Sequence, residues 1–345
     1  MTITTSALTD ATQAEWDAFV AAHPDGTFFH QAAWRRVLER AFRHRTFFLI
    51  ARRGGAIVGV LPLAHVKSML FGQSLISTPF CVYGGPLAVD AEAHAALATA
   101  ADAVMAQTGV KVMEWRPREH VPTAPGWHER SDLYVTFRRA IEASDEANMK
   151  AIPRKQRAVV RKGIDRGLTA TVDRDVAGLH AIYAESVRNL GTPVFSRRYF
   201  EILAETFADS MDVLTVRDAG VPVAAVMNFY WRDEVLPYYG GGTAAARGCH
   251  ANDFMYWEVM RHAAARGCRL FDFGRSKLAT GAFSFKKNWG FAPQPLAYRF
   301  RLAGGAGIPD HNPLNPKYRL FIAAWKRLPL PLANLIGPHI VRGVG

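Results

Sequence analysis

Residues that could carry chemistry gather between positions 269 and 290. The short alternating run Leu270–Phe273 is typical of a strand, and it ends with the carboxylate of Asp272 close to a glycine. Lys286 and Lys287 follow among aromatic side chains. A lysine here could neutralise a phosphate or a developing oxyanion, and Asp272 could orient or deprotonate an attacking amine. The alternative for Asp272 is a strand-end carboxylate with a purely structural role.

Arg275 and Trp289 complete the candidates in this segment. Phe283 and Phe285 alternate, which predicts a strand that turns both rings inward and leaves one lysine beside a cleft. We expect that lysine to be Lys286, with Lys287 facing solvent as a secondary binding residue. The alternative is a surface strand whose lysines extend along apolar neighbours into water.

Three consecutive glycines precede a predicted helix at 253–266, for which Asn252 is the expected N-cap and Gly267 the C-terminal glycine. Backbone amides at a helix N-terminus can bind a phosphate or carboxylate. Because the glycines form neither a Walker loop nor a GxGxxG motif, they do not indicate ATP or NAD binding. An ordinary tight turn would avoid the conformational entropy that three glycines cost, so we favour a functional corner. The candidate substrate-binding residues here are Tyr238, Tyr239, Gly240, Gly241 and Gly242.

A basic run at 153–166 is predicted to be helical, with Pro153 at the first helical position. Arg154, Arg157 and Arg161 fall on one face at helical spacing. Guanidinium groups match phosphate geometry, so this row could hold a diphosphate. A solvated charged face explains the run equally well, and the sequence leaves the two interpretations open.

Bulk composition indicates a soluble two-domain protein. The chain has 345 residues, more than one core usually supports, with 49% hydrophobic and 21% charged residues. Its net charge of +12 favours anionic partners, although a merely basic protein would look the same. Three scattered cysteines indicate reduced thiols, and no histidine spacing predicts a metal site. Since no signal peptide or membrane span is evident, we expect a cytoplasmic protein.

The same order of elements occurs twice along the chain, which predicts a duplicated α/β domain with a cleft between the copies. Each half has helices, a hairpin, a strand that ends at glycines, a further helix and a closing strand. The predicted domains are residues 1–142, residues 143–302 and a tail at 303–345. The expected helices are 10–22, 28–38, 91–108, 176–189, 197–207 and 253–266, and the expected strands are 46–52, 57–65, 75–82, 111–116, 213–217, 223–231, 235–239 and 270–273.

The tail carries an expected amphipathic basic helix from Tyr318, followed by an apolar stretch at 329–338 that proline interrupts. We expect the tail to pack across the two domains. Contact with the inner face of a membrane is the alternative, because basic amphipathic helices bind anionic lipid surfaces.

Several motifs resemble those of FemABX-type peptidyltransferases. Phe285–Gly290 resembles their Phe-Lys-x-x-Phe-Gly motif, Leu270–Gly274 the strand before it, and Lys155–Lys162 the start of their second domain. The resemblance covers essentially the whole chain. In the N-terminal half it includes Phe29-His30 with Trp34 and Tyr83–Pro86, and in the tail Asn312–Phe321 with Trp325–Leu330 is similar to FemAB-related proteins of exosortase/PEP-CTERM systems.

This resemblance implies an α/β (α+β) fold of two tandem GNAT-like domains, each a mixed sheet flanked by helices. It implies amide formation between an activated acyl or aminoacyl donor and an amine, in assembly of peptidoglycan, exopolysaccharide or another envelope polymer. It also implies that Lys286 stabilises donor phosphate or the transition state. Expected partners are a phosphate-bearing donor and an amine acceptor, with no DNA, no metal and no tightly bound cofactor.

The donor stays open between acyl-CoA and aminoacyl-tRNA. The helical hairpin that some tRNA-using members insert has no room in this sequence, which disfavours tRNA. The segment Arg247–His250 does not match the GNAT pyrophosphate motif, so CoA use is not indicated either. The alternatives are an acyl-CoA-dependent N-acyltransferase acting on an amino sugar and a GNAT-like module that binds a partner without catalysis.

Overall fold

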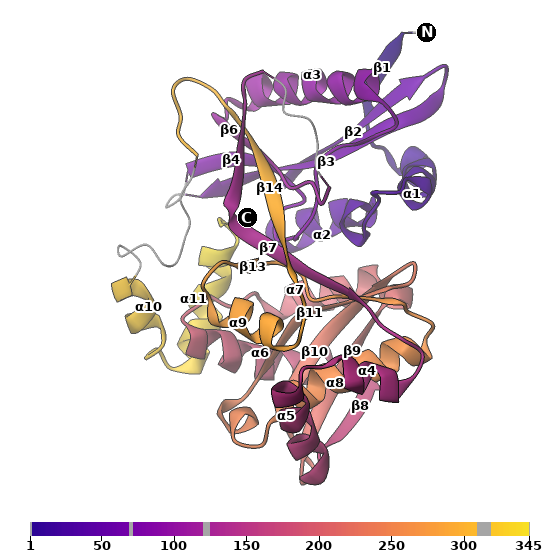
Figure 1. Ribbon diagram of the computed structural model, residues 1–345. Helices are drawn as coiled ribbons and strands as arrows, with labels where there is room; N and C mark the ends of the chain where they lie inside the picture. The colour runs from indigo at the N-terminus through magenta and orange to yellow at the C-terminus, as the bar shows by residue number, and fades with distance from the viewer. Residues whose placement is uncertain (1, 69–71, 120–124, 309–318, 345) are drawn as a thin grey trace. The chain divides into compact units, whose positions relative to one another are not determined.

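The computed structural model describes residues 2–68, 72–119, 125–308 and 319–344 (Figure 1). Contacts divide the chain into two compact units. Unit 1 comprises residues 1–133, 296–311 and 342–345, and unit 2 comprises residues 134–295 and 312–341. These units differ from the predicted domains because a late strand returns to unit 1 and most of the tail joins unit 2.

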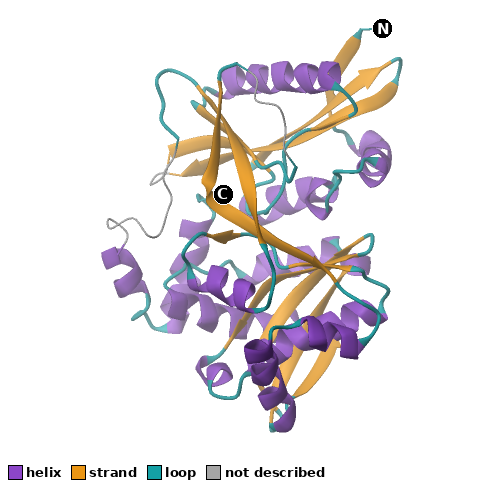
Figure 2. Cartoon of the chain, in the orientation of Figure 1, coloured by secondary structure: helices purple, strands orange, loops and turns teal. Residues whose placement is uncertain are grey.

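Unit 1 is a mixed sheet with helices on both faces (Figure 2). The strand order is β1-β2-β3-β4-β6-β14, in which β4 and β6 are parallel and the other pairs antiparallel. Helix α3 packs against β1–β3, and Figure 1 shows it on the face opposite α1 and α2. The elements are β1 (Ile3–Ala7), α1 (Gln13–Ala22), α2 (Ala33–Phe42), β2 (Arg45–Arg53), β3 (Ala56–Ser68), β4 (Gly72–Ser77), β5 (Leu87–Ala88), α3 (Ala91–Thr108), β6 (Val112–Trp115) and the later part of β14 (Pro293–Leu302).

Unit 2 repeats this plan. Its strand order is β7-β12-β11-β10-β9-β8, with β11 and β12 parallel, and β13 also pairs with β7. Helix α8 packs on β9–β11, and α5 packs on α8. The elements are the later part of β7 (Trp127–Ala140), α4 (Asp145–Ala151), α5 (Arg154–Asp165), β8 (Thr169–Asp173), α6 (Val176–Leu190), α7 (Arg197–Thr206), β9 (Met211–Asp218), β10 (Val221–Trp231), β11 (Glu234–Gly242), α8 (Ala251–Ala265), β12 (Leu270–Asp272), β13 (Ser276–Lys277), α9 (Gly281–Asn288), α10 (Arg319–Trp325) and α11 (Leu330–Val341).

The predicted mixed sheets flanked by helices are confirmed in both units. Each hairpin turns on two residues with positive φ, Gly54 and Gly55 in unit 1 and Ala219 and Gly220 in unit 2. Two left-handed residues match the twist of antiparallel strands, and glycine adopts that conformation readily. The glycines in both turns therefore allowed the hairpins to be predicted from the sequence. Helix α3 also has the predicted bounds, because Asp90 caps it and the left-handed Gly109 ends it.

Some predicted helix boundaries are wrong. The helix expected at 28–38 begins at Ala33, after a short 3-10 turn at Phe28–His30. Helix α8 is preceded by His250 in the left-handed conformation, so Asn252 is not its N-cap. Pro153 precedes α5 as the N-cap residue rather than occupying its first turn.

The tail helices α10 and α11 belong to unit 2. Trp325 is buried and donates from Nε1 to the carbonyl of Thr192, and α11 contacts α6. The interrupted apolar stretch is helical despite Pro338 inside it. The motif at Asn312–Tyr318 lies outside the described residues. No helix in the described ranges is both long and apolar enough to cross a membrane.

Candidate active site

Lys286 lies on a helix, not on the predicted strand. Helix α9 begins after Thr280, whose side chain accepts a hydrogen bond from the amide of Phe283. Two aromatic residues at alternate positions share one face of a strand, whereas a helix turns them about 200° apart around its axis. The Thr280 cap favours the helix, so the alternation was a misleading signal here. The helix leaves Lys287 exposed, as expected, and partly buries Lys286.

The Lys286 ammonium group is enclosed by backbone carbonyls and rings. Its Nζ donates to the carbonyl oxygens of Gly274 and Arg275, each at 3.0 Å. It also lies 5.7 Å from the ring centre of Phe137 and 6.0 Å from that of Phe273. Lys286 is therefore held by the loop that follows β12.

Burial lowers the pKa of Lys286 to about 7, against an ordinary value of 10.5. Asp272 opposes this shift because a nearby negative charge favours the ammonium form, while the positive charge of Arg275 adds to it. A neutral amine keeps two N–H donors and one lone pair. Both donors match the two carbonyls, so near pH 7 the lone pair of Lys286 can accept a proton.

Asp272 lies beneath this loop and is completely buried. Its Oδ1 accepts the amide N–H of Gly274 at 2.7 Å, and its Oδ2 lies 3.2 Å from Nε of Arg138. Arg138 also pairs with Glu234. Since the side chain of Asp272 has no exposed surface, this geometry does not suit the predicted role of orienting an incoming amine. Asp272 instead holds the Gly274 turn and acts electrostatically on Lys286.

The predicted glycine corner is wrong, because Gly240, Gly241 and Gly242 continue strand β11. They pair with Ala224–Val226 of β10. A Cβ on Gly241 would lie 2.5 Å from Cβ of Ser186, and the other two positions are equally crowded. Close packing therefore explains the glycines, and their amides do not form a helix N-terminus.

Tyr238 occupies a β-bulge. The register changes from Asn228 opposite Pro237 to Met227 opposite Tyr239, which leaves Tyr238 as the extra residue. Bulges redirect side chains and often occur beside active sites. Tyr238 is half-buried, whereas Tyr239 is a core residue whose hydroxyl bonds that of Tyr199 at 2.7 Å.

The parallel ladder between β11 and β12 is short. It contains only the pairs Glu234 with Leu270 and Val235 with Phe271. Beyond these pairs, β11 continues to the bulge at Tyr238, and β12 leads into the loop that binds Lys286. The carboxyl ends of parallel strands are where open α/β sheets bind ligands, so this end of unit 2 is the candidate site.

Trp289 is a core residue and not a stacking surface for a ligand. It is fully buried, and its Nε1 donates to Oδ1 of Asp253 at 3.0 Å. Gln156 also bonds that carboxylate, and burial raises the pKa of Asp253. Sequence inspection missed this link between α5, α8 and α9. An aspartate in the first turn of α8 resembles an ordinary helix-start residue.

The arginine row of α5 is divided. Arg157 donates to the carbonyls of Ile152 and Lys150, whereas Arg154 and Arg161 are exposed.

Arg275 lies over the ring of Tyr134, 4.6 Å from its centre. The structure thus brings Lys286, Asp272 and Arg275 together.

Comparisons with known proteins agree with this arrangement. Residues 148–287 match the family model described as the acetyltransferase (GNAT) domain. The crystal structure of FemX is similar with a TM-score of 0.69 and 16% identity, covering 92% of this chain and all of that one. A tandem GNAT protein from the clavulanic acid biosynthesis pathway has a TM-score of 0.56 and 14% identity, covering 89% of this chain and all of that one.

The structure of L-PGS from Bacillus licheniformis is also similar, with a TM-score of 0.55, 13% identity and 96% coverage of both chains. None of the curated proteins matches the sequence. At these identities the likeness establishes the fold. The chain therefore has the fold of FemX and of tandem GNAT proteins, and its residues 148–287 match the model of the GNAT acetyltransferase domain.

Proposed function

We propose that this protein is an acyltransferase that joins an activated acyl or aminoacyl group to an amine, forming an amide. The observation that carries the proposal is Lys286, a lysine with a pKa of about 7 at the carboxyl ends of two parallel strands. The match of residues 148–287 to a GNAT domain supports the same chemistry.

In the proposed step the amine nitrogen attacks the carbonyl carbon of a thioester or ester. The new C–N bond forms as the carbonyl π electrons move to oxygen, and the C–S or C–O bond then breaks. The lone pair of Lys286 accepts the proton that the amine loses, and the resulting ammonium group returns it to the leaving group. Asp272 supports the ammonium form during this cycle, because its negative charge raises the pKa of Lys286.

Two donor classes remain candidates. The structure of the clavulanic acid pathway protein is named as the form without AcCoA, which associates that protein with this thioester. An acyl-CoA thioester is therefore the first donor to test. An aminoacyl ester of tRNA is the second, with an envelope or exopolysaccharide precursor as acceptor. The support for that acceptor is the sequence resemblance of the tail and of the Lys286 segment. An amino sugar is the alternative acceptor.

We also propose peripheral membrane contact through the tail. Exposed apolar side chains recur along both tail helices, with Leu320 86% exposed in α10 and Leu335 66% exposed in α11. Lys326 and Arg327 are exposed between them along the chain. A segment that combines exposed apolar residues with cations is typical of helices that bind the interface of an anionic bilayer.

The catalytic proposal is tested by comparing Lys286→Ala with Lys287→Ala. The two lysines are adjacent on α9, but only Lys286 is bound by the loop, so Lys287→Ala controls for lost charge and helix content. Acyl transfer from acetyl-CoA and from aminoacyl-tRNA to a panel of amines is measured. We expect Lys286→Ala to lose about 10²–10⁴-fold in rate and Lys287→Ala to stay near wild type.

The dependence of the wild-type rate on pH provides a second readout. Because the base must be deprotonated, kcat/KM should rise with pH and level off above about 7. Equal activity of Lys286→Ala and wild type would contradict the proposed base. Absence of transfer with every donor, in protein that binds a donor, would favour the non-catalytic module.

A further inference from the structure

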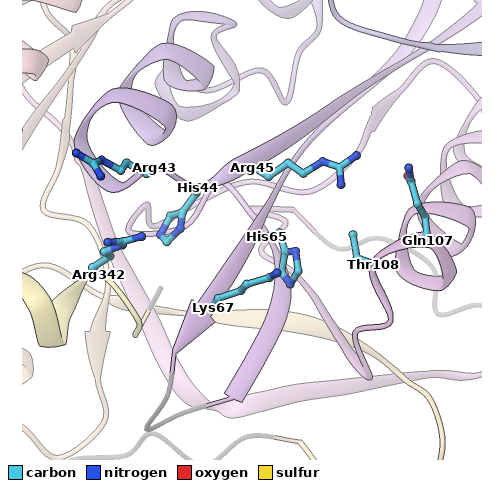
Figure 3. A pocket seen from close by; sticks show the side chains of 8 residues that line it. All are labelled: Arg43, His44, Arg45, His65, Lys67, Gln107, Thr108 and Arg342. Atoms are coloured by element: carbon cyan, nitrogen blue, oxygen red, sulfur yellow. The ribbon is translucent and has the colours of Figure 1, made fainter.

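A cavity of about 360 Å³ lies at the edge of unit 1 where β2 begins and β3 ends. Its volume falls in the range of small-molecule sites, about 300–1,000 Å³. It involves none of the residues assigned to acyl transfer, all of which lie in unit 2. Figure 3 shows the eight lining side chains, from Arg43, His44, Arg45, His65, Lys67, Gln107, Thr108 and Arg342.

The lining carries four permanent positive charges and no acidic side chain. Arg43 ends α2 with a left-handed backbone, Arg45 begins β2, Lys67 lies near the end of β3, and Arg342 follows α11. All four are exposed, and in the described parts of the chain none forms an ion pair. Gathered like charges repel one another and raise the local concentration of anions.

His44 provides a buried polar atom at the same place. Only 5% of the residue is exposed, and its ring stacks with Phe42 and Phe80 at centroid distances of 5.7 and 5.8 Å. Its Nε2 is buried and has no hydrogen-bond partner among the described residues. Burial lowers the pKa of His44 to about 4 and the charge of Arg342 adds to the shift, while hydrogen bonding of the ring with the Arg342 backbone opposes it. Buried polar atoms are rarely left without a partner, so an ordered water or a polar ligand atom could satisfy this nitrogen.

Unit 2 offers an internal comparison, since its β9–β10 hairpin corresponds to β2–β3. Near the open end of that hairpin Asp212 lies opposite Asn228, at the register positions that Phe47 and Leu63 hold in unit 1. Arg45 and His65 lie two residues further from the turn, where Tyr230 stands in place of His65. Asp212 accepts hydrogen bonds from Asn228 and Tyr230, and it bonds His262 at 3.0 Å. The polar groups at this end of the unit 2 hairpin therefore satisfy one another, whereas the lining of the unit 1 cavity gathers four cations without an acidic partner.

We propose that this cavity of unit 1 binds a phosphate-bearing ligand. Arg43, Arg45, Lys67 and Arg342 supply the charge, since guanidinium forks match phosphate oxygens. His44 Nε2 hydrogen-bonds the ligand inside the cavity, and the four positive charges of the lining repel an amine or a metal cation. The ligand is a free phosphate ester or diphosphate, or the headgroup of a phospholipid, and its site is separate from the acyl-transfer site.

Calorimetric titration of the full chain with inorganic pyrophosphate at low ionic strength tests the proposal. The variant Arg45→Glu/Lys67→Glu reverses two lining charges at exposed positions, where folding should tolerate it. Arg36→Glu on the exposed face of α2 is the control for overall charge. We expect pyrophosphate to bind wild type and Arg36→Glu, and binding to the double variant to weaken at least tenfold.

Vesicles of phosphatidylglycerol, compared with phosphatidylcholine vesicles, distinguish the two sources of phosphate. Loss of phosphatidylglycerol binding in the double variant would assign the site to a lipid headgroup, whereas unchanged vesicle binding with weakened pyrophosphate binding would assign it to a free phosphate ester.

His44→Phe keeps the ring stacking but removes Nε2, and we expect it to weaken binding several-fold without changing the unfolding temperature of the unliganded protein. The proposal is overturned if wild type binds neither probe, or if the double variant binds both as wild type does. Because acyl transfer by Lys286 is measured separately, failure of one proposal leaves the other intact.

Discussion

Lys286 Nζ lies 3.0 Å from the carbonyl oxygen of Gly274, a residue held by the carboxylate below it. The Gly274 amide donates to Asp272 at 2.7 Å, and its φ of 65° is a conformation that glycine adopts without strain. The turn therefore presents its N–H to the buried acid and its C=O to the lysine. This explains how a buried carboxylate without access to substrate can still influence Lys286.

The lowered pKa of Lys286 predicts a pH-dependent stability. Between about pH 7 and the ordinary value of 10.5, the unfolded chain binds a proton that the folded protein lacks. Unfolding free energy should therefore rise with pH across this window. Lys286→Met removes the titrating group, so the difference in unfolding free energy between wild type and Lys286→Met should shift in favour of wild type from pH 7 to pH 10. Urea unfolding at several pH values measures this difference in unfolding free energy. A difference that does not change with pH would show that Lys286 titrates normally.

Replacing Asp272 with Asn should destabilise unit 2 and change the titration of Lys286. The substitution leaves the guanidinium of Arg138 without one of its buried carboxylate partners, which costs about 3 kcal/mol in unfolding free energy. Loss of the negative charge should also move the rising limb of the rate profile to lower pH. Asp218→Asn, in an exposed pair with Arg166, is the matched control and should change stability little. An unchanged pH profile would disprove the electrostatic link.

Gly241→Ala tests the packing explanation for the three glycines. The added methyl group would lie 2.5 Å from Cβ of Ser186, so we expect a loss of about 1–3 kcal/mol. Gly281→Ala, where nothing lies within 4 Å of the new Cβ, should not destabilise. Ser186→Gly should cost less in the Gly241→Ala background than alone, which a double-mutant cycle of unfolding free energies measures. Additive costs would show that the two residues do not clash.

The tail proposal predicts binding to anionic vesicles. Leu320→Glu/Leu335→Glu places charge on exposed apolar positions, so sedimentation with phosphatidylglycerol vesicles should fall at least tenfold. Val221→Glu, on an exposed valine of the β9–β10 hairpin, is the control for added charge on an apolar surface. Equal sedimentation of the tail variant and wild type would exclude this surface.

Much of the fold could be predicted because its signals are local. Alternation predicted the strands, glycines predicted the hairpin turns, and Gly109 predicted the end of α3. The repetition of the pattern then predicted the duplication. These features depend on residues close in sequence, whose conformations are set by their own side chains and backbones.

The candidate site depended on tertiary structure for its chemistry. The sequence by itself determined which residue types were available and that Lys286 was the lysine to examine. Only the fold decided that Asp272 is buried, that Trp289 packs in the core and that Gly240–Gly242 make room for neighbouring side chains. Burial and the distances between segments far apart in the chain set these outcomes, and they also lower the pKa of Lys286.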